Sequence, residues 1–418
     1  MTIEPIMDAT TWAEQTFGGV KLGDKRRSRR AVQLGAALVN NPAASLPQQV
    51  GSMAALTASY QLLHEPDVTH AVLLTPHWQQ TRAQAGTYPL VLLSADTTIL
   101  DYSHHRKTTA LGPIGNGKGR GYLVHSVLAL LPQPRQVLGL AHQIPLVPQP
   151  KITGETLRQM QGRRRQTDVW QEAVEAIGAP PAGVSWVHIG DRGSDIFRFL
   201  ATCQTQHCAF VVRAAKNRRV AVDGDEELDG EDEEGVETDP LIDYLFPVVR
   251  ARTSQGRRTL AIPARRGTPA RDAAVAISWG ALRLLPPRQE QADGPIDAWV
   301  VRVWEPDPPS GIKTPLEWIL LSSVETESED AAWERVAWYA CRWTNEDYHQ
   351  CLKTGCELEA RHLWDQPALE RLLAFCAPVA IQLLQLRDLA RIDPERPAIE
   401  VVEPQLVAVV AQVTGTAS

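Results

Sequence analysis

Four residues in the run WYACRWTNEDYHQCLKTG have types and a spacing that suit chemistry on phosphate. Tyr339, Arg342, Glu346 and Lys353 follow the pattern Y-x2-R-x3-E-x6-K. If the run is helical, a rotation of roughly 100° per residue places the four side chains within about 60° of arc. One helix face would then carry a carboxylate, two cations and a phenol. We expect Glu346 to bind a metal ion and the other three to hold phosphate, Arg as a planar fork and Lys as a point charge.

Two earlier acids follow apolar runs that predict strands. Asp96 follows the run LVLLSA, and Asp191 directly follows SWVHIG. Three converging carboxylates could hold two divalent ions about 3.5 to 4 Å apart, an arrangement that stabilises both the attacking and the leaving oxygen in phosphoryl transfer. Oxygen ligands without thiols suit Mg²⁺, and we expect Mn²⁺ to substitute for it. The attacking group would be a water molecule or a hydroxyl of the substrate, not a protein side chain.

Each of these acids also has a structural interpretation. Asp96 could simply end a strand, and Asp191 could cap a helix that begins near Ser194. Glu346 lies four residues after Arg342, as in an ordinary i,i+4 ion pair. The joint pattern favours a metal site at Asp96, Asp191 and Glu346.

The chain resembles a known family over nearly its whole length. The runs LSADTT and IGDRGSD and the Tyr-Arg-Glu-Lys spacing are similar to those of cut-and-paste insertion-sequence transposases of the Asp-Asp-Glu class. The resemblance extends, in order, to WAEQTFGGVKLGDKRRSRR, YLVHSVLALL, PLEWILLSS and ERLLAFCAPVAIQLLQLR. It implies binding to terminal inverted repeats, cleavage by two metal ions through a hairpin intermediate, and transfer of 3′ ends into target DNA. It also implies a synaptic homodimer.

The resemblance implies roles for residues around the acids. Tyr339, Arg342 and Lys353 would contact the transposon end near the cleaved phosphate. Trp318 matches a tryptophan that stacks on a flipped base, although the alternation in LEWILL fits a core residue equally well. Trp343 is a second residue with both interpretations.

Two further arginines are candidates for the same groove. Arg192 directly follows Asp191, and Arg213 ends the run AFVVR. Their cationic side chains would contact DNA phosphates.

The N-terminal region contains a dense group of cations that suits the DNA backbone. Between Lys21 and Arg30 there are six Lys or Arg residues, with Asp24 as the one acid. They open a predicted helix that ends at Asn41-Pro42. For recognition of the DNA ends we select Lys25, Arg26, Arg27 and Arg30. The alternative is an ordinary solvated helix face.

The net charge of −7 conceals this basic character. Eleven acids and no Lys or Arg lie between Asp223 and Asp239, and the charge without them is +4. We interpret this segment as a solvated insertion. A second interpretation is an electrostatic brake that competes with DNA for a basic groove.

Composition and length limit the class of protein. The 418 residues are 44% hydrophobic, as in globular proteins of two or three domains. There is no signal-peptide pattern, and the apolar run Leu372–Leu386 is too short to span a bilayer, so we expect a cytoplasmic, nucleoid-associated bacterial protein without membrane contact. The six cysteines lack zinc-site spacing, which indicates reduced thiols.

The order of patterns predicts an α/β fold with a ribonuclease-H-like mixed sheet and helices on both faces. Three strand runs are followed by helix, strand, helix and strand; VAISW, ALRLL, AWVVRVW and LEWILLSS are later short strands. We predict five segments: a helical DNA-binding domain at 1–70, the first part of the catalytic core at 71–214, an inserted β subdomain at 215–330, the Glu346 helix at 331–365, and a short C-terminal helical region at 366–418.

The sequence therefore favours a Mg²⁺-dependent DNA transposase with double-stranded DNA as its partner. The family continues into a helical dimerisation region, whereas here only a helix at Ala368–Leu389 and a segment at Glu403–Val413 follow. That difference makes a non-transposing, DNA-binding regulator the alternative. A nuclease without strand transfer is a third possibility.

Overall fold

The computed structural model describes residues 8–150, 154, 164–222, 241–262, 270–288, 294–312, 314–402, 404, 407 and 412. The acidic segment 223–239 lies outside the described residues, as does most of 403–413. The chain divides into two compact units. The first comprises Met1–Val169 and Trp343–Ser418, and the second comprises Trp170–Arg342.

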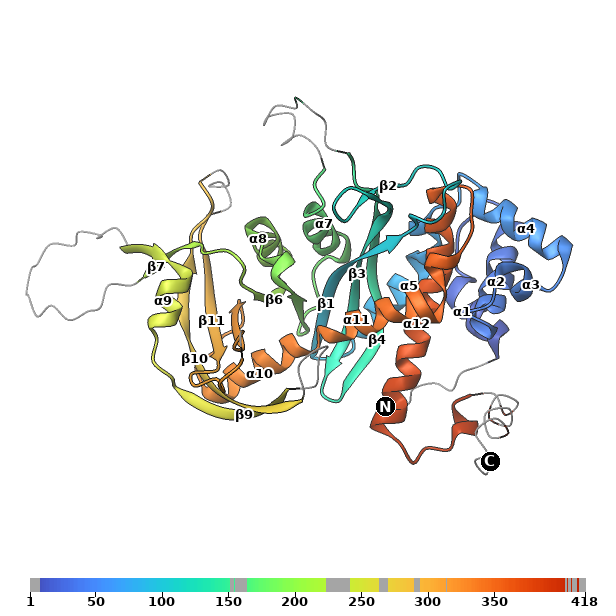
Figure 1. Ribbon diagram of the computed structural model, residues 1–418. Coiled ribbons are helices and arrows are strands. Elements are labelled where there is room, and N and C mark those ends of the chain that lie inside the picture. The colour runs from blue at the N-terminus through green and yellow to red at the C-terminus, as the bar shows by residue number, and fades with distance from the viewer. Residues whose placement is uncertain are drawn as a thin grey trace, which may run out of the picture. The chain divides into compact units, whose positions relative to one another are not determined.

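The first unit begins with a group of helices, shown in blue in Figure 1. Their starts are capped by short polar side chains, as the sequence requires: the Asp24 carboxylate accepts the Arg26 N–H, and the Ser52 hydroxyl accepts the Ala55 N–H. Gly35 allows close packing, because a Cβ there would come within 2.6 Å of the Phe17 ring. The helices are α1 (Ala9–Phe17), α2 (Lys25–Asn40), α3 (Leu46–Val50), α4 (Met53–His64) and α5 (His70–Ala85).

An antiparallel sheet follows these helices in the first unit. One edge of β3 pairs with β1, and its other edge pairs with β2 and β4. The three long strand runs expected from the sequence are confirmed as β1, β3 and β4. The strands are β1 (Leu90–Asp101), β2 (Gly112–Ile114), β3 (Gly119–Pro132) and β4 (Arg135–Leu146).

The C-terminal part of the first unit contains α11 (Trp343–Gln350) and the long helix α12 (Gln366–Ile392). The expected helix at Ala368–Leu389 is therefore confirmed. Both α5 and α12 pack on β4 (Figure 1), whereas α11 packs on β1. By length and composition α12 could cross a membrane, but 72% of its most apolar window is buried within the protein, as in a core helix.

The second unit is built around a mixed sheet (Figure 1). Its strand order is β5-β6-β12-β11-β10-β7-β8, with β9 paired to β10; β5 and β6 are parallel and the other pairs are antiparallel. The strands are β5 (Ser185–Gly190), β6 (Ala209–Arg213), β7 (Arg219–Val222), β8 (Leu241–Tyr244), β9 (Gly256–Ile262), β10 (Arg271–Leu284), β11 (Ile296–Trp304) and β12 (Glu317–Ser322).

Helices pack on this sheet in the second unit. α10 contacts β6, β10, β11 and β12, while α8 packs on β6 and α9 on β8. The separate strands expected at VAISW and ALRLL are wrong, because both belong to the continuous 14-residue strand β10. The helices are α7 (Asp168–Ile177), which starts two residues before this unit, α8 (Phe197–Thr205), α9 (Leu245–Ala251) and α10 (Glu329–Ala340).

Candidate functional site

The run that carries Tyr339, Arg342, Glu346 and Lys353 is not one regular helix, so the condition on which the single-face expectation rests is not met. α10 ends at Ala340 with tight bonds in which the Cys341 and Arg342 N–H groups donate to carbonyls three residues back. A new helix, α11, starts at Trp343, and a π-helical turn occupies Cys351–Gly355. Tight and π turns rotate by other than 100° per residue, so a face computed from ideal α-helical geometry does not extend across them.

In the first unit, Asp96 lies on the sheet face that α11 covers. Asp96 pairs with Ser126 across β1 and β3, and Ser126 pairs with Gln143 across β3 and β4. Directly opposed residues point to the same face of a sheet, and so does Ser94, two residues before Asp96. Asn345 of α11 donates its side-chain N–H to Ser94 Oγ at 2.8 Å.

A second contact fixes α11 on the same face. Gln143 Nε2 donates to the Tyr348 hydroxyl at 3.0 Å. Glu346 lies between the two anchoring residues, Asn345 and Tyr348, and is exposed, whereas both anchors are fully buried. The first unit therefore holds Glu346 on a helix fixed to the Asp96 face of its sheet.

Lys353 lies in the π-helical turn, and its ammonium group is 3.5 Å from Glu359 Oε1. Glu359 Oε1 also accepts the backbone N–H of Asp101, the last residue of β1. Burial lowers the pKa of His349, one helical turn before Lys353, to about 3, with the Lys353 charge as a second cause. The Lys353 cation thus already has a carboxylate partner near the end of the Asp96 strand.

In the second unit, Asp191 follows β5 as expected and also acts as a cap. Its Oδ1 accepts the Gly193 N–H at 2.7 Å, which begins a 3-10 turn at Arg192–Ser194. The structural interpretation of Asp191 as a cap is thus observed, although the helix α8 itself begins later, at Phe197. The cap occupies Oδ1, which is one of the two carboxylate oxygens of Asp191.

The loop after Asp191 is fixed by a buried ion pair. Asp195 Oδ1 accepts from Arg218 Nε at 2.8 Å and from Nη2 at 2.5 Å, and both side chains are almost fully buried. Asp195 Oδ2 accepts the backbone N–H groups of Ala215 and Lys216, both at 2.7 Å. Through these bonds Asp195 connects the loop after Asp191 to residues 215–218, which follow β6.

Tyr339, Trp318 and three arginines lie close together in the second unit. The rings of Trp318 and Tyr339 meet edge to face with centroids 5.2 Å apart, and the Arg342 guanidinium lies 6.0 Å from the Tyr339 centroid. Burial lowers the pKa of Arg213; the charges of Arg192 and Arg342 lower it further, and Tyr339 opposes them. A concentration of positive charge of this kind attracts an anion.

Exposure distinguishes these residues from one another. Tyr339 and Arg342 are only 3% and 8% exposed, whereas Arg192 is exposed and Trp318 is half-buried. Trp343 in the first unit is 36% exposed, so its interpretation as a core residue is wrong. The most accessible members of the arginine group are therefore Arg192 and Arg213.

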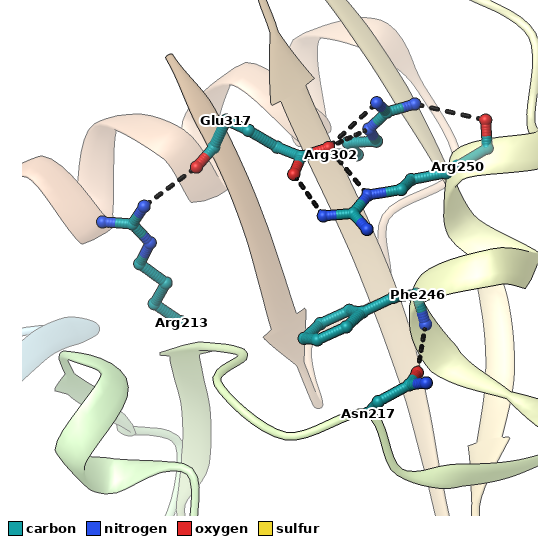
Figure 2. Close-up of polar contacts among 6 residues, drawn as sticks. All are labelled: Arg213, Asn217, Phe246, Arg250, Arg302 and Glu317. Atoms are coloured by element: carbon teal, nitrogen blue, oxygen red, sulfur yellow. Dashed lines mark hydrogen bonds and ion pairs between the residues drawn. The ribbon is translucent and has the colours of Figure 1, made fainter. Parts of the chain in front are cut away.

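Glu317 anchors the strand that carries Trp318, as Figure 2 shows. Its carboxylate accepts from Arg250 Nη2 at 2.6 Å and from Arg302 Nε at 3.0 Å. Its backbone carbonyl accepts from Arg213 Nη2 at 2.9 Å. The Arg250 hydrogen bond, followed by that of Arg302, lowers the pKa of Glu317, so it stays ionised. Arg213 is thereby held beside Trp318.

The site residues predicted at and around the three acids fall into two groups, each described within its own unit. The first unit contains Asp96, Trp343, Glu346 and Lys353. The second unit contains Asp191, Arg192, Arg213, Trp318, Tyr339 and Arg342.

The three acids suit a divalent metal by their chemistry, because carboxylate oxygens are the ligands that Mg²⁺ prefers. Among the described residues, no group of three or more His, Cys, Asp or Glu side chains is gathered around a common point that could hold a metal ion. Within the first unit, Asn345 and Tyr348 anchor α11, the helix of Glu346, on the sheet that contains Asp96.

The N-terminal cations cluster at the start of α2. Lys25 and Arg26 are exposed, and Arg27 and Arg30 are half-buried. Cations are unfavourable at the positive end of a helix dipole, so their concentration there points to an external anion. Arg26, Arg27 and Arg30 line a cavity of about 490 Å³ between α2 and α4.

Acids occupy part of this basic surface. Arg27 Nη2 contacts Glu65 Oε2, and Arg27 Nη1 lies 3.6 Å from Asp67 Oδ2. Arg27 is therefore engaged within the protein, whereas Arg26 and Lys25 face solvent.

Four polar residues under α11 are not among the predicted site residues: Ser94, Ser126, Gln143 and Asn345. All four are buried. Three of them interrupt apolar strand runs, in LVLLSA, LVHSVLALL and GLAHQIPL. A buried polar side chain must find a partner, so such interruptions could have identified the contact surface for a polar helix.

One comparison with known proteins bears on the N-terminal helices. Residues 9–68 match the model of the family described as transposase DNA-binding. The match includes α1 to α4 and all of the cations selected above. It supports a transposase that binds DNA through this segment.

Proposed function

We propose that this protein is a transposase that binds the terminal inverted repeats of its own insertion sequence, cleaves them and joins the freed 3′ ends to target DNA. Three features support the proposal: the transposase DNA-binding match at residues 9–68, the cations at the start of α2, and the helix that carries Glu346 fixed to the Asp96 face. Double-stranded DNA is the substrate, and a homodimer would hold two ends together.

The side chains can be given separate tasks. Asp96, Asp191 and Glu346 would be the metal ligands. When bound, two Mg²⁺ ions supply positive charge that stabilises the attacking and leaving oxygens at the phosphate. Arg192 and Arg213 would hold the phosphate backbone, because guanidinium groups form paired hydrogen bonds with phosphate oxygens.

Trp318 is half-buried, and its ring meets that of Tyr339 edge to face. An aromatic ring that remains partly exposed can stack on an unpaired base, an interaction worth about 1 to 3 kcal/mol per base. This supports a distorted or hairpin DNA end next to the cut.

The observation that carries the proposal is the fixed position of Glu346 on the Asp96 face, in a chain with a transposase DNA-binding segment. The test is incubation of a duplex carrying the element's own end with Mg²⁺ or Mn²⁺ and either the unmodified protein or Glu346→Gln. We expect cleavage only by the unmodified protein, with equal DNA binding by both. Cleavage that survives Glu346→Gln would refute the site.

A matched control comes from the next residue. Asp347 pairs with Arg387 Nη1 at 2.7 Å, on the same helix as Glu346. Asp347→Asn removes one carboxylate charge from α11 without touching the proposed ligands. We expect this variant to cleave as the unmodified protein does.

The burial of Tyr339 and Arg342 favours a second candidate, a DNA-binding regulator that occupies ends without cutting them. The same experiment separates the two functions. If neither the unmodified protein nor any variant cleaves, while the unmodified protein still binds the ends without forming a paired-end complex, the regulator would be supported. Cleavage without joining to a target duplex would indicate a nuclease.

A further inference from the structure

A buried hydrogen-bond network lies beneath α11, with Gln143 at its centre. Gln143 Nε2 donates to Ser126 Oγ and to the Tyr348 hydroxyl, both at 3.0 Å. Its Oε1 faces His70 Nε2 at 3.0 Å. All four side chains are at least nine-tenths buried. The network joins β3, β4, the start of α5 and α11.

The donors and acceptors of this network match one another. Burial lowers the pKa of His70 to about 4, so the ring is neutral at pH 7 and its Nε2–H donates to Gln143 Oε1. Both amide N–H groups of Gln143 are then used by Ser126 and Tyr348. Burial also raises the pKa of Tyr348 well above its usual value, which keeps its hydroxyl uncharged. Every polar atom of the Gln143 amide thus has a partner.

Asn345 makes the second polar anchor at a cost to stability. Its side-chain nitrogen donates to Ser94, but its Oδ1 is buried without a hydrogen-bond partner. An unsatisfied buried carbonyl costs about 1–3 kcal/mol. A leucine of similar size would avoid that cost, so stability alone does not explain this asparagine.

The two anchors restrict how α11 can move. Apolar contacts are weakly directional, so a helix held by them alone can rotate or slide on a sheet. The hydrogen bonds that join Asn345 to β1 and Tyr348 to β4 are directional. Together they define the rotation of α11 about its axis and its distance from the sheet. Glu346 is next to Asn345 and two residues from Tyr348. The position of its side chain therefore depends on these two anchors.

We propose that Asn345 and Gln143 are positioning residues, which hold Glu346 over the Asp96 face through Ser94 and Tyr348. The inference rests on the proposed function, because it gives these contacts a role in the placement of a metal ligand. Metal ligands and catalytic groups must be held within about 0.5 Å of the productive geometry, and supporting contacts determine that placement.

The test compares Asn345→Leu with the unmodified protein and with Thr344→Val. Asn345→Leu keeps the side-chain volume but removes the anchor. Thr344 is the adjacent residue on α11, buried, with a hydroxyl that has no hydrogen-bond partner, so Thr344→Val is a matched control. Tyr348→Phe removes the anchor between Tyr348 and Gln143 by loss of a single oxygen.

We expect Asn345→Leu and Tyr348→Phe to unfold at temperatures close to that of the unmodified protein. Their kcat for end cleavage should fall about 10- to 100-fold, with KM for DNA unchanged. Binding of Mn²⁺, followed by electron paramagnetic resonance without DNA, should weaken by a similar factor. Thr344→Val should behave as the unmodified protein in all three measurements.

The outcomes separate the inference from the proposed function. Normal kcat and Mn²⁺ binding in a stably folded Asn345→Leu, with an active unmodified protein, would overturn the positioning role alone. If Asn345→Leu is strongly destabilised, normal kcat in stably folded Tyr348→Phe overturns the role in the same way. An unmodified protein that neither cleaves nor binds Mn²⁺ would overturn both proposals.

Discussion

The side-chain amide of Asn345 donates to Ser94 Oγ at 2.8 Å, a bond between residues 251 positions apart in the chain. It connects the residue before Glu346 to the residue two positions before Asp96. Each partner is therefore a direct or near neighbour of an acid that the sequence marks as functional. An uncharged hydrogen bond thus joins α11 to β1, the two elements of the first unit that carry the proposed metal ligands Glu346 and Asp96.

The ion pair between Asp195 and Arg218 should contribute strongly to the stability of the second unit. Asp195→Ala leaves the Arg218 guanidinium buried without its carboxylate, and removal of one partner of a buried pair costs about 3–5 kcal/mol. Urea unfolding followed by tryptophan fluorescence would measure this loss. The exposed Asp272 of β10 is the control: Asp272→Ala should change the unfolding free energy by about 0.5 kcal/mol or less. Equal effects of the two changes would contradict the prediction.

Glu65 should weaken DNA binding by competing for Arg27. Glu65→Gln removes the carboxylate that contacts Arg27 and should raise the affinity for duplex DNA by up to about fivefold, or about 1 kcal/mol. Fluorescence anisotropy at 50 mM salt would show this gain, and screening should reduce it at high salt. Glu14→Gln on α1, an exposed acid outside the cavity, serves as the control. A gain of the same size for both variants would indicate only a change in net charge.

The cations at the start of α2 should set the salt dependence of DNA binding. If Arg26 contacts one phosphate, Arg26→Ala should lower the slope of log affinity against log salt concentration by about 0.9. Its effect should be similar for all duplex sequences. Arg288→Ala removes an exposed arginine of the second unit and tests for non-specific attraction. A slope that changes for Arg288→Ala but not for Arg26→Ala would place the DNA elsewhere.

Stability should fall on acidification because several histidines are buried in their neutral form. Burial lowers the pKa of His188 to about 3, below the usual 6.5, so the unfolded state binds more protons between these values. The stability contributed by the neutral ring is complete above pH 6.5 and is lost as pH falls towards 3, with a slope of up to about 1.4 kcal/mol per pH unit. Burial also lowers the pKa of four other histidines to about 3 or 4: His70, His77, His142 and His349.

The contribution of one histidine can be isolated by substitution. His188→Phe should make the unfolding free energy less steep between pH 6 and pH 4, as measured by urea unfolding at a series of pH values. The exposed His104 is the control, since His104→Gln should leave the slope unchanged. An unchanged slope for His188→Phe would show that this ring does not titrate on unfolding.

Local patterns were sufficient for most secondary structure. Alternating or continuous apolar runs predicted β1, β3, β4, β5 and β12, and the Asn41-Pro42 pair predicted the end of α2. The pattern failed where geometry departs from the ideal. One such place is the tight turn at Cys341–Arg342, and another is the π turn at Cys351–Gly355. The run from Cys341 to Thr354 contains neither proline nor glycine, so the local sequence did not predict a break in the helix.

Residue types and near neighbours along the chain are enough to predict which side chains could do chemistry and which of them end strands or begin helices. They predicted roles for Asp96, Asp191, Glu346 and the cations of α2. Long-range packing had to be seen to show that Arg27 is held by Glu65, that Tyr339 and Arg342 are buried, and that Asn345 and Gln143 fix α11. Those features depend on partners up to 251 residues away, and a hydrogen bond at that separation exists only after the sheet has formed.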